Sequence, residues 1–316
     1  MKVFVAGATG ALGRQLVPRL VAAGHDVVGM TRSEERAGLV RELGAEPAVA
    51  DALDPDAVGA AVSTARPEVI VHQLTALSGS LDLRHFDRTF AQTNRLRTEG
   101  TDILLSAARA AGTRRFVAQS FAGWPAARTG GPVKTEDDPL DSDPPAAVRP
   151  VLDAIVYLER AVTGAAPIEG LALRYGGFYG PGTSLELDPP AGEHVEAIRG
   201  RKFPIVGVGR GVWSFVHIED AAEATTIAVE RGAPGVYNVV DDNPSAVRDW
   251  LPELARELGA KRPLRVPRWL GRIMAGEAAT VMMTEVRGAS NAKAKRELGW
   301  TPRHPSVVGA LARGAG

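Results

Sequence analysis

The chain of 316 residues contains no cysteine. It therefore cannot form a disulfide, a thiolate zinc site, an iron–sulfur cluster or a cysteine nucleophile. It also has no excess of charge, because 37 basic residues balance 37 acidic ones and no run rich in Lys or Arg interrupts this balance. Such a chain has no general attraction for nucleic acid or for an anionic membrane, so we expect neither as a partner.

Two further features are missing. No apolar run approaches the length that crosses a membrane, and a strand pattern begins at the second residue, which leaves no room for a signal or transit peptide. These absences predict a cytoplasmic protein. The six histidines show no metal-ligand spacing with acidic residues, so we expect no metal site.

A glycine-rich turn near the start is the clearest motif that is present. The stretch KVFVAGATGALGRQLVPRLVAAG is typical of a buried strand, a tight turn and an amphipathic helix. Gly7 permits the turn, Gly10 lets backbone amides approach a pyrophosphate, and Gly13 lets the helix pack closely on the strand. The sequence therefore predicts a dinucleotide-binding turn formed by Gly7, Thr9, Gly10, Ala11, Leu12 and Gly13.

The end of the second strand indicates which dinucleotide binds. Where a carboxylate would accept from the ribose hydroxyls of NAD, the chain has Thr31 followed by Arg32. A guanidinium pairs with a 2′-phosphate, so we expect NADP(H) and regard NAD as less favoured. In the alternative interpretation, Arg32 and Arg36 only begin a solvated helix. After the third strand, Asp51 beside Ala52 is expected to accept from the adenine amino group, with a simple turn as the alternative.

Strand-like and helix-like segments alternate through the following residues. EVIVHQL at 68–74 and RRFVAQS at 114–120 flank a long helix pattern from about 88 to 111. This rhythm predicts an α/β fold with a doubly wound parallel sheet. The segment 129–150, rich in Pro, Asp and Gly, is typical of a long surface loop that folds over a site.

Several stretches together carry a family resemblance: GATGALG, EGTDILLSAARAAGTRRFVAQS, LRYGGFYGPG, FVHIEDAAEA, GVYNVVDD and SNAKAKRELGWTP. With these the chain resembles an extended short-chain dehydrogenase/reductase of the NAD(P)-dependent epimerase/dehydratase type. The resemblance implies a Rossmann domain over 1–175, to which 212–240 returns, and a smaller substrate-binding domain over 176–211 and 241–316. It implies a homodimer through helices near 96–111 and 151–164. It also implies cofactor contacts at Leu74, Thr75, Tyr175, Gly177 and Phe178.

The family's proton-transfer residues are incomplete here. Members use a serine or threonine, a tyrosine that exchanges the substrate proton, and a lysine four residues later that lowers the tyrosine pKa. Ser120 matches the serine, but none of the four tyrosines has a lysine four residues later. One register of the next helix places Val151 and Ile155 at the tyrosine and lysine positions, and the other uses Tyr157 followed by Ala161. We prefer the first register and keep Ser120 and Tyr157 as catalytic candidates.

Aromatic residues suggest the kind of substrate. Trp213 replaces the arginine that grips the diphosphate of nucleotide sugars, and we expect it to line an apolar cleft with Phe121 and Trp124. A tyrosine without its lysine keeps a pKa near ~10 and remains a proton donor, which favours reduction. The sequence thus predicts an NADP(H)-dependent reductase of a small, largely apolar carbonyl or enone. An isomerase, lyase or cyclase with structural NADP(H), or a dinucleotide-sensing binding protein, are the alternatives.

Overall fold

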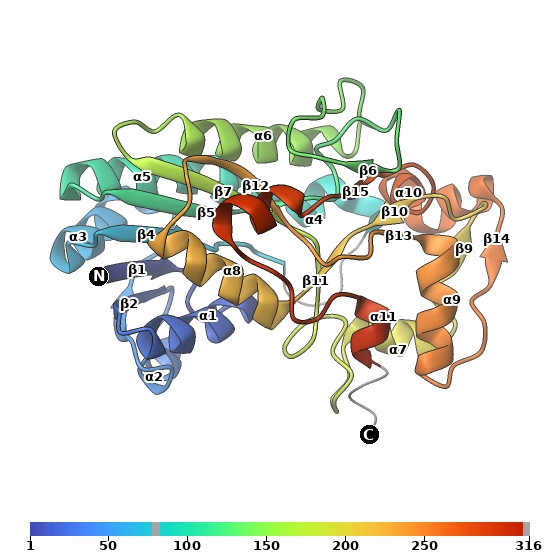
Figure 1. Cartoon of the computed structure of the whole chain (residues 1–316), viewed down its shortest axis with the longest axis horizontal. Coiled ribbons are helices and arrows are strands. Elements are labelled where there is room, and N and C mark those ends of the chain that lie inside the picture. Colours follow the sequence, from blue (N-terminus) through green and yellow to red (C-terminus); the bar gives the residue numbers. More distant parts are fainter. Residues whose placement is uncertain (78–82, 312–316) are drawn as a thin grey trace.

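The computed structural model describes residues 1–77 and 83–311. Its centre is a parallel sheet with the strand order β12-β7-β5-β4-β1-β2-β3 (Figure 1). These seven strands are β1 (Lys2–Ala6), β2 (Asp26–Thr31), β3 (Glu46–Val49), β4 (Val69–His72), β5 (Arg115–Phe121), β7 (Glu169–Tyr175) and β12 (Gly235–Val239). The order reverses beside β1, so the predicted doubly wound α/β fold is confirmed, and β1 and β4 lie at the switch point where such sheets bind ligands.

Helices cover both faces of the sheet (Figure 1). One face packs against α1 (Ala11–Ala22), α2 (Glu34–Glu42) and α8 (Ile218–Glu230), and the other against α3 (Pro55–Ala65), α5 (Glu99–Ala111) and α6 (Arg149–Thr163). A further helix, α4 (Phe86–Arg97), follows the short 3-10 turn η1 (Leu83–His85) and packs on α6. Because both faces are buried, the central strands are nearly continuous apolar runs, such as VIVH in β4.

The remaining elements form a smaller part at the right of Figure 1. Its helices are α7 (Glu193–Arg199), α9 (Val247–Glu257), α10 (Arg268–Thr284) and α11 (Val307–Leu311). The π-helical turn η2 (Ala294–Leu298), which precedes α11, packs instead on α8 and β12 beside the main sheet. Its short strands pair as β8 (Gly177–Tyr179) with β11 (Phe215–His217), β9 (Ile205–Val206) with β14 (Arg265–Val266), and β10 (Val212–Trp213) with β13 (Ser245–Ala246). A separate apolar cluster around Trp250 fills this part. The division into two domains at the boundaries given above stays a prediction.

The long segment 129–150 is fastened to the carboxyl edge of the sheet. Its strand β6 (Val133–Lys134) pairs with β15 (Gly288–Ala289). Glu136 accepts a hydrogen bond of 2.7 Å from the backbone amide of Asn238 in β12. Burial raises the pKa of the Glu136 carboxyl. Among the described helices, none is both long and apolar enough to cross a membrane.

Candidate functional site

Glycine occupies the positions of closest backbone approach in and beside the turn between β1 and α1. Gly7 has a φ of +97°, and a Cβ atom there would lie 2.8 Å from the carbonyl oxygen of Gln73. At Gly13 a Cβ atom would lie 2.3 Å from the carbonyl oxygen of Gly7. Gly10 is the N-cap of α1 and has no side chain that could cap the helix. The first backbone amides of the helix therefore remain available as hydrogen-bond donors to another group. Such a helix start is suited to bind an anion.

Two buried polar atoms at the same edge of the sheet have no hydrogen-bond partner among the described residues. They are Thr31 Oγ1 at the end of β2 and Gln73 Oε1 directly after β4. The two residues are only 4% and 5% exposed. An unsatisfied buried polar group is costly, and a bound molecule that donates to or accepts from it removes this cost. The open helix start and these two atoms fit a dinucleotide that lies across β1, β2 and β4.

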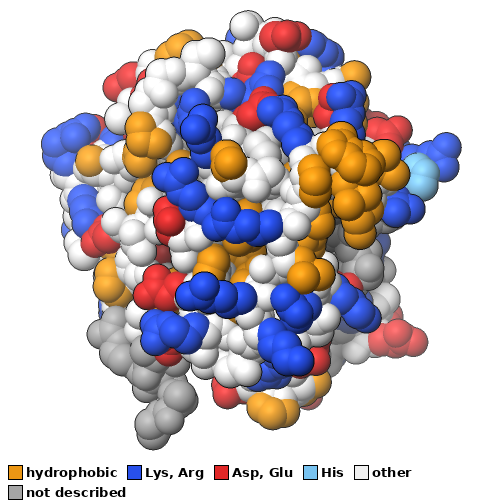
Figure 2. Space-filling view, turned by 90° about the vertical axis from the view of Figure 1, so that its right-hand side faces the viewer, with side chains coloured by type: hydrophobic (Ala, Val, Ile, Leu, Met, Phe, Trp, Pro, Cys, Tyr) orange, Lys and Arg blue, Asp and Glu red, His pale blue; other side chains and the backbone are white. Residues whose placement is uncertain are grey.

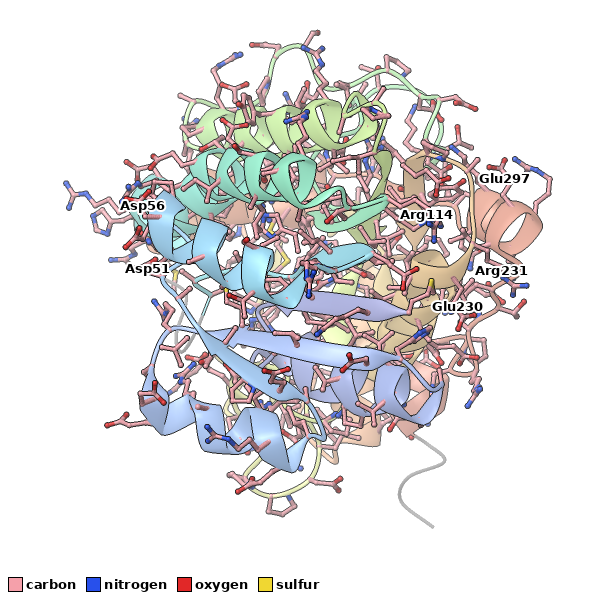
Figure 3. All side chains as sticks on the ribbon, turned by 90° about the vertical axis from the view of Figure 1, so that its left-hand side faces the viewer. Asp51, Asp56, Arg114, Glu230, Arg231 and Glu297 are labelled. Carbon is pink, nitrogen blue, oxygen red and sulfur yellow. The ribbon has the colours of Figure 1, made fainter. Side chains whose placement is uncertain are left out.

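The predicted adenosine contacts lie around this edge. Arg32 is exposed directly after β2, and Asp51 is exposed after β3. Figure 3 shows Asp51 at the end of the strands opposite to Arg114, which precedes β5. Asp51 Oδ1 accepts from the Leu53 amide at 3.0 Å, as in a turn, and Ala52 beside it is buried. The structure thus gives Asp51 a turn hydrogen bond, and its contact with adenine stays a prediction.

The other predicted cofactor contacts differ in accessibility. Leu74 is half-buried and Thr75 exposed, both directly after β4. Tyr175 ends β7 with its ring 1% exposed, and its hydroxyl lies 2.7 Å from Thr225 Oγ1 of α8. Burial raises the pKa of Tyr175 well above its ordinary value. The Tyr175 side chain is therefore not accessible to a cofactor. Gly177 and Phe178 are partly accessible, and the Phe178 ring centroid lies 5.4 Å from that of Tyr175.

Ser120 belongs to a buried ion-pair network that the sequence did not predict. Its hydroxyl donates to Glu159 Oε1 of α6 at 2.6 Å. Arg174 of β7 donates to both oxygens of the same carboxylate, with Nε and Nη2 each at 2.7 Å. All three residues are at most 6% exposed. The Ser120 proton is thus engaged within the protein, and a direct role of Ser120 toward a substrate stays a prediction.

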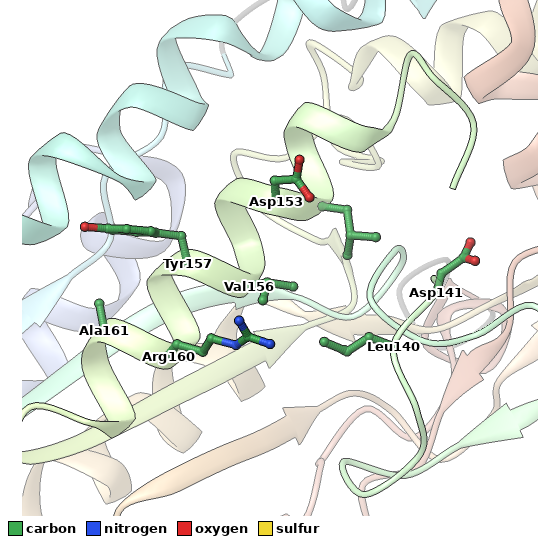
Figure 4. Close-up of a pocket in the computed structure, with 8 residues that line it drawn as sticks. Leu140, Asp141, Asp153, Val156, Tyr157, Arg160 and Ala161 are labelled. Carbon is green, nitrogen blue, oxygen red and sulfur yellow. The ribbon is translucent and has the colours of Figure 1, made fainter. Parts of the chain in front are cut away.

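Tyr157 lies on the opposite side of α6 from Glu159, because residues two apart on a helix project about 200° apart. Its side chain is 42% exposed, and its hydroxyl donates to Asp102 of α5 at 2.6 Å, which raises the pKa of the phenol. It lines an open hollow of about 730 Å³ together with Asp153, Arg160 and Asp141 (Figure 4). The structure therefore does not bring Tyr157 and Ser120 together. The predicted homodimer would use this outer surface of α5 and α6.

In the preferred register, the residues at the expected tyrosine and lysine positions belong to a buried apolar cluster. Val151 and Ile155, the residues at the expected tyrosine and lysine positions, are 1% and 0% exposed. They pack with Trp124, and the other members of the cluster are Phe86, Phe90, Val148, Ala278, Val281 and Val286, with Phe121, Trp213 and Met282 at its border. The three predicted substrate residues thus meet in one apolar cluster.

Aromatic edges and faces line this cluster. The Phe86 and Trp124 rings meet edge to face with centroids 5.5 Å apart, and Trp213 is held by a hydrogen bond of 2.8 Å from Nε1 to the Met282 carbonyl.

Arg97 of α4 is a buried cation to which the sequence assigned no role. Burial lowers its pKa to about 10, and its Nη1 has no partner in the described residues.

The structure also gathers three potential metal ligands that are far apart in the sequence. One atom each of His217, Glu219 and His304 lies within 4.8 Å of the others. The two imidazole rings stack with centroids 3.8 Å apart at 23°, so their in-plane lone pairs run nearly parallel and do not converge on one point. His304 Nδ1 is fixed at 3.1 Å from Asp220 Oδ2. This arrangement is better described as a stacked pair than as a metal centre.

The chain can now be compared with known proteins. The model of the NAD dependent epimerase/dehydratase family matches residues 3–239. The chain is 47% identical over 318 residues to a 3-diazoavenalumate denitrifying reductase of a Streptomyces species, with 99% of this chain and 100% of that protein covered. It is 30% identical over 264 residues to a 4-hydroxy-2-methyl-3-oxo-4-farnesyl-3,4-dihydroquinoline-1-oxide ketoreductase of Stigmatella aurantiaca, with 83% and 74% covered.

A solved structure supports the same fold. The UDP-glucose 4-epimerase of Thermotoga maritima superposes with a TM-score of 0.76 at 21% identity, covering 99% of this chain and 96% of that one. At this identity the similarity concerns the fold alone.

Proposed function

Because the chain belongs to the NAD dependent epimerase/dehydratase family, we propose that it is an NADPH-dependent reductase that transfers hydride to an aromatic substrate carrying a diazonium group, with release of dinitrogen. The family supplies the fold and a nicotinamide dinucleotide as cofactor. The apolar cluster around Val151, Ile155 and Trp124 is the observation that carries the choice of acceptor.

A ketone acceptor requires a proton for the oxygen that hydride transfer leaves negative. An arenediazonium acceptor requires none. The hydride and its electron pair form the new carbon–hydrogen bond, while the carbon–nitrogen bond breaks and its electron pair leaves with dinitrogen. Atoms and charges balance without a protein acid. A cluster with Val151 and Ile155 at the tyrosine and lysine positions of the preferred register is therefore compatible with this reaction.

The charge of the acceptor gives a second reason for the missing lysine. A diazonium ion is a cation, and a lysine 4 Å away would repel it by about 4 kcal/mol at an effective dielectric constant of about 20. Aromatic faces attract cations instead. Trp124 and Trp213, with Phe86 and Phe121, provide such faces around the cluster. The aromatic residues of this cluster would thus suit a cationic aromatic ring.

The cofactor would be held by the amino-terminal turn. The backbone amides that follow Gly10 would donate to its pyrophosphate. The side-chain oxygens of Thr31 and Gln73 would form hydrogen bonds with its ribose groups. Arg32 would pair with the 2′-phosphate of NADPH. When bound, the reduced dinucleotide supplies the hydride. The protein would orient the substrate ring against it and keep water out by the apolar cluster.

Reduction of an apolar ketone is the second candidate. It is supported by the relative from Stigmatella aurantiaca, which is a ketoreductase, and by the closed apolar environment itself. In that case the proton would come from water or from a group outside the cluster.

One experiment separates these functions. The protein is mixed anaerobically with NADPH and either a benzenediazonium carboxylate or the ketone of matched size, while NADPH oxidation and dinitrogen release are followed together. Equimolar oxidation and dinitrogen release, absent with the Gly13→Ala variant, support the proposal. Oxidation only with the ketone supports the second candidate. Product without net oxidation, or binding of NADPH without any turnover, would overturn both and support an isomerase or a dinucleotide sensor.

A further inference from the structure

The balanced charge of the whole chain conceals a strongly cationic surface. The segments 197–212 and 258–276 contain nine basic residues and not one Asp or Glu. These residues are Arg199, Arg201, Lys202, Arg210, Lys261, Arg262, Arg265, Arg268 and Arg272. All except Arg201 are exposed. Since the chain as a whole is neutral, the other residues carry the compensating negative charge.

The fold joins the two segments into one surface. Strand β9 of the first segment pairs in parallel with β14 of the second. The Arg201 side chain donates from Nε to the backbone oxygen of Arg262 at 3.0 Å. Helix α10, which follows β14, packs on β9. Figure 2 shows this side of the molecule, where Lys and Arg side chains are widespread and hydrophobic side chains gather in a compact patch.

Large apolar side chains are exposed among these cations. In α10, Trp269 is 65% exposed, Ile273 68% and Met274 49%. Leu264 and Val208, at 46% and 53%, continue the patch toward β14 and β9. Trp269 and Ile273 are four residues apart and therefore lie on one side of the helix. An apolar patch with a charged rim marks an interaction site.

Much of the cationic charge is not neutralised within the chain. Arg268 forms an ion pair with Glu285, Arg272 with Glu277, and Arg199 with Glu196. Lys202, Arg210, Lys261, Arg262 and Arg265 have no carboxylate within 4.0 Å in the part of the chain that the structure describes. An acidic partner would find these charges available, and only Arg262 among the five shares a described surface hollow with carboxylates, those of Asp249 and Glu253.

We infer that this surface, hereafter the α10 surface, docks an acidic protein that presents an amphipathic helix with carboxylates beside its apolar residues. The composition favours a protein over the other polyanions. Seven of the nine cations are arginine, and Arg, Trp and Met are the residues enriched in protein interfaces, where Lys is depleted. Nucleic acid requires the cations but gives Ile273 and Met274 no partner.

The α10 surface is continuous with the candidate substrate cluster. The first half of α10 carries the exposed patch, and its second half contributes Ala278 and Val281 to the cluster with Trp124 and Ile155. Gly276, with φ 87° and ψ 176°, separates the two halves. A partner seated on the first half would therefore bind the same helix that contributes to the place where we propose the substrate ring to bind.

A synthetic peptide tests the inference. The probe is a fluorescein-labelled amphipathic helix of about 20 residues with Glu on one side and Leu and Met on the other. Its controls are the peptide with Lys for Glu and the peptide with Gln for Leu and Met. Binding to the full chain is measured by fluorescence anisotropy at low and high salt. The variants are Trp269→Ala with Ile273→Ala, and Arg262→Glu with Arg265→Glu; the matched controls are Leu140→Ala and Arg41→Glu, which are exposed elsewhere.

We expect the full chain to bind the acidic probe and neither control peptide. Each α10 double variant should bind the probe at least tenfold more weakly, and both control variants should bind it as the unchanged chain does. Affinity should fall at high salt. Circular dichroism verifies that the variants fold. Equal binding of the Gln control peptide, or no effect of the variants, would overturn the inference. Stronger binding to vesicles of anionic lipid than to the probe, lost in the same variants, would assign the α10 surface to a membrane instead. A change of oligomeric state in the Trp269 variant would assign it to a second copy of the chain.

Discussion

A single methyl group at Gly13 tests whether the amino-terminal turn binds the cofactor. The Cβ atom of Gly13→Ala would lie 2.3 Å from the Gly7 oxygen and 2.5 Å from the Ala8 oxygen, whereas ordinary contacts begin at 3.4 Å. The backbone must therefore yield by roughly 1 Å, and overpacking of this kind costs about 1–3 kcal/mol. The shift separates the start of α1 from the turn, so the amides no longer converge on one pyrophosphate.

Hydrogen bonds to a charged group contribute about 1.5–3 kcal/mol each, so the loss of one weakens binding at least about tenfold. NADPH fluorescence titration measures this change. Gly59→Ala is the matched control, because its Cβ would meet nothing within 4 Å in α3. Alanine stabilises a helix interior by about 0.5–1 kcal/mol relative to glycine, so this variant should bind NADPH normally. Unchanged NADPH affinity in Gly13→Ala, with an intact fold, would refute the assignment of the turn.

Further predictions concern four single side chains. Arg32→Ala should weaken NADPH at least tenfold more than NADH in the same titration, and equal losses would show that Arg32 does not bind the 2′-phosphate. Ser120→Ala should lower the melting temperature, because it removes a charge-assisted hydrogen bond to Glu159. Tyr157→Phe should leave turnover unchanged, because Tyr157 is exposed on the outer side of α6. A loss of turnover in Tyr157→Phe would show that the phenol takes part in the reaction. Burial raises the pKa of Asp241 from 3.8 to about 7, so the stability that protonation provides is present at low pH and lost as pH rises through 7. Asp241→Asn should therefore raise the melting temperature at pH ~8 and lose this advantage near pH ~4; a pH-independent effect would contradict the burial of the charge.

The fold and the turn were predictable because their signals are local. Gly7, Gly10 and Gly13 stand between an apolar run and an amphipathic helix, and backbone geometry at such a turn depends on the residues themselves. The strand–helix alternation fixes a parallel sheet for the same reason. The absence of a lysine four residues after any tyrosine is equally a property of the sequence alone.

Contacts between distant segments were not predictable. Ser120 and Arg174 are neighbours only because β5 and β7 pair in register, and Glu159 reaches both from α6. Nothing in the sequence alone connects Glu159 with these two partners. In the same way, the α10 surface combines two segments that are unremarkable in a neutral chain until β9 pairs with β14.

The most direct test of the account follows the hydrogen that is transferred. The protein is supplied with NADPH deuterated at the transferring position of the nicotinamide and with an arenediazonium carboxylate in ordinary water, and the product is examined by mass spectrometry; the labels are then exchanged, with unlabelled NADPH in heavy water. We predict deuterium on the former diazonium carbon in the first case and none in the second, since no proton enters the bond that forms. Deuterium from heavy water at that carbon would contradict a reductase that works without a proton donor.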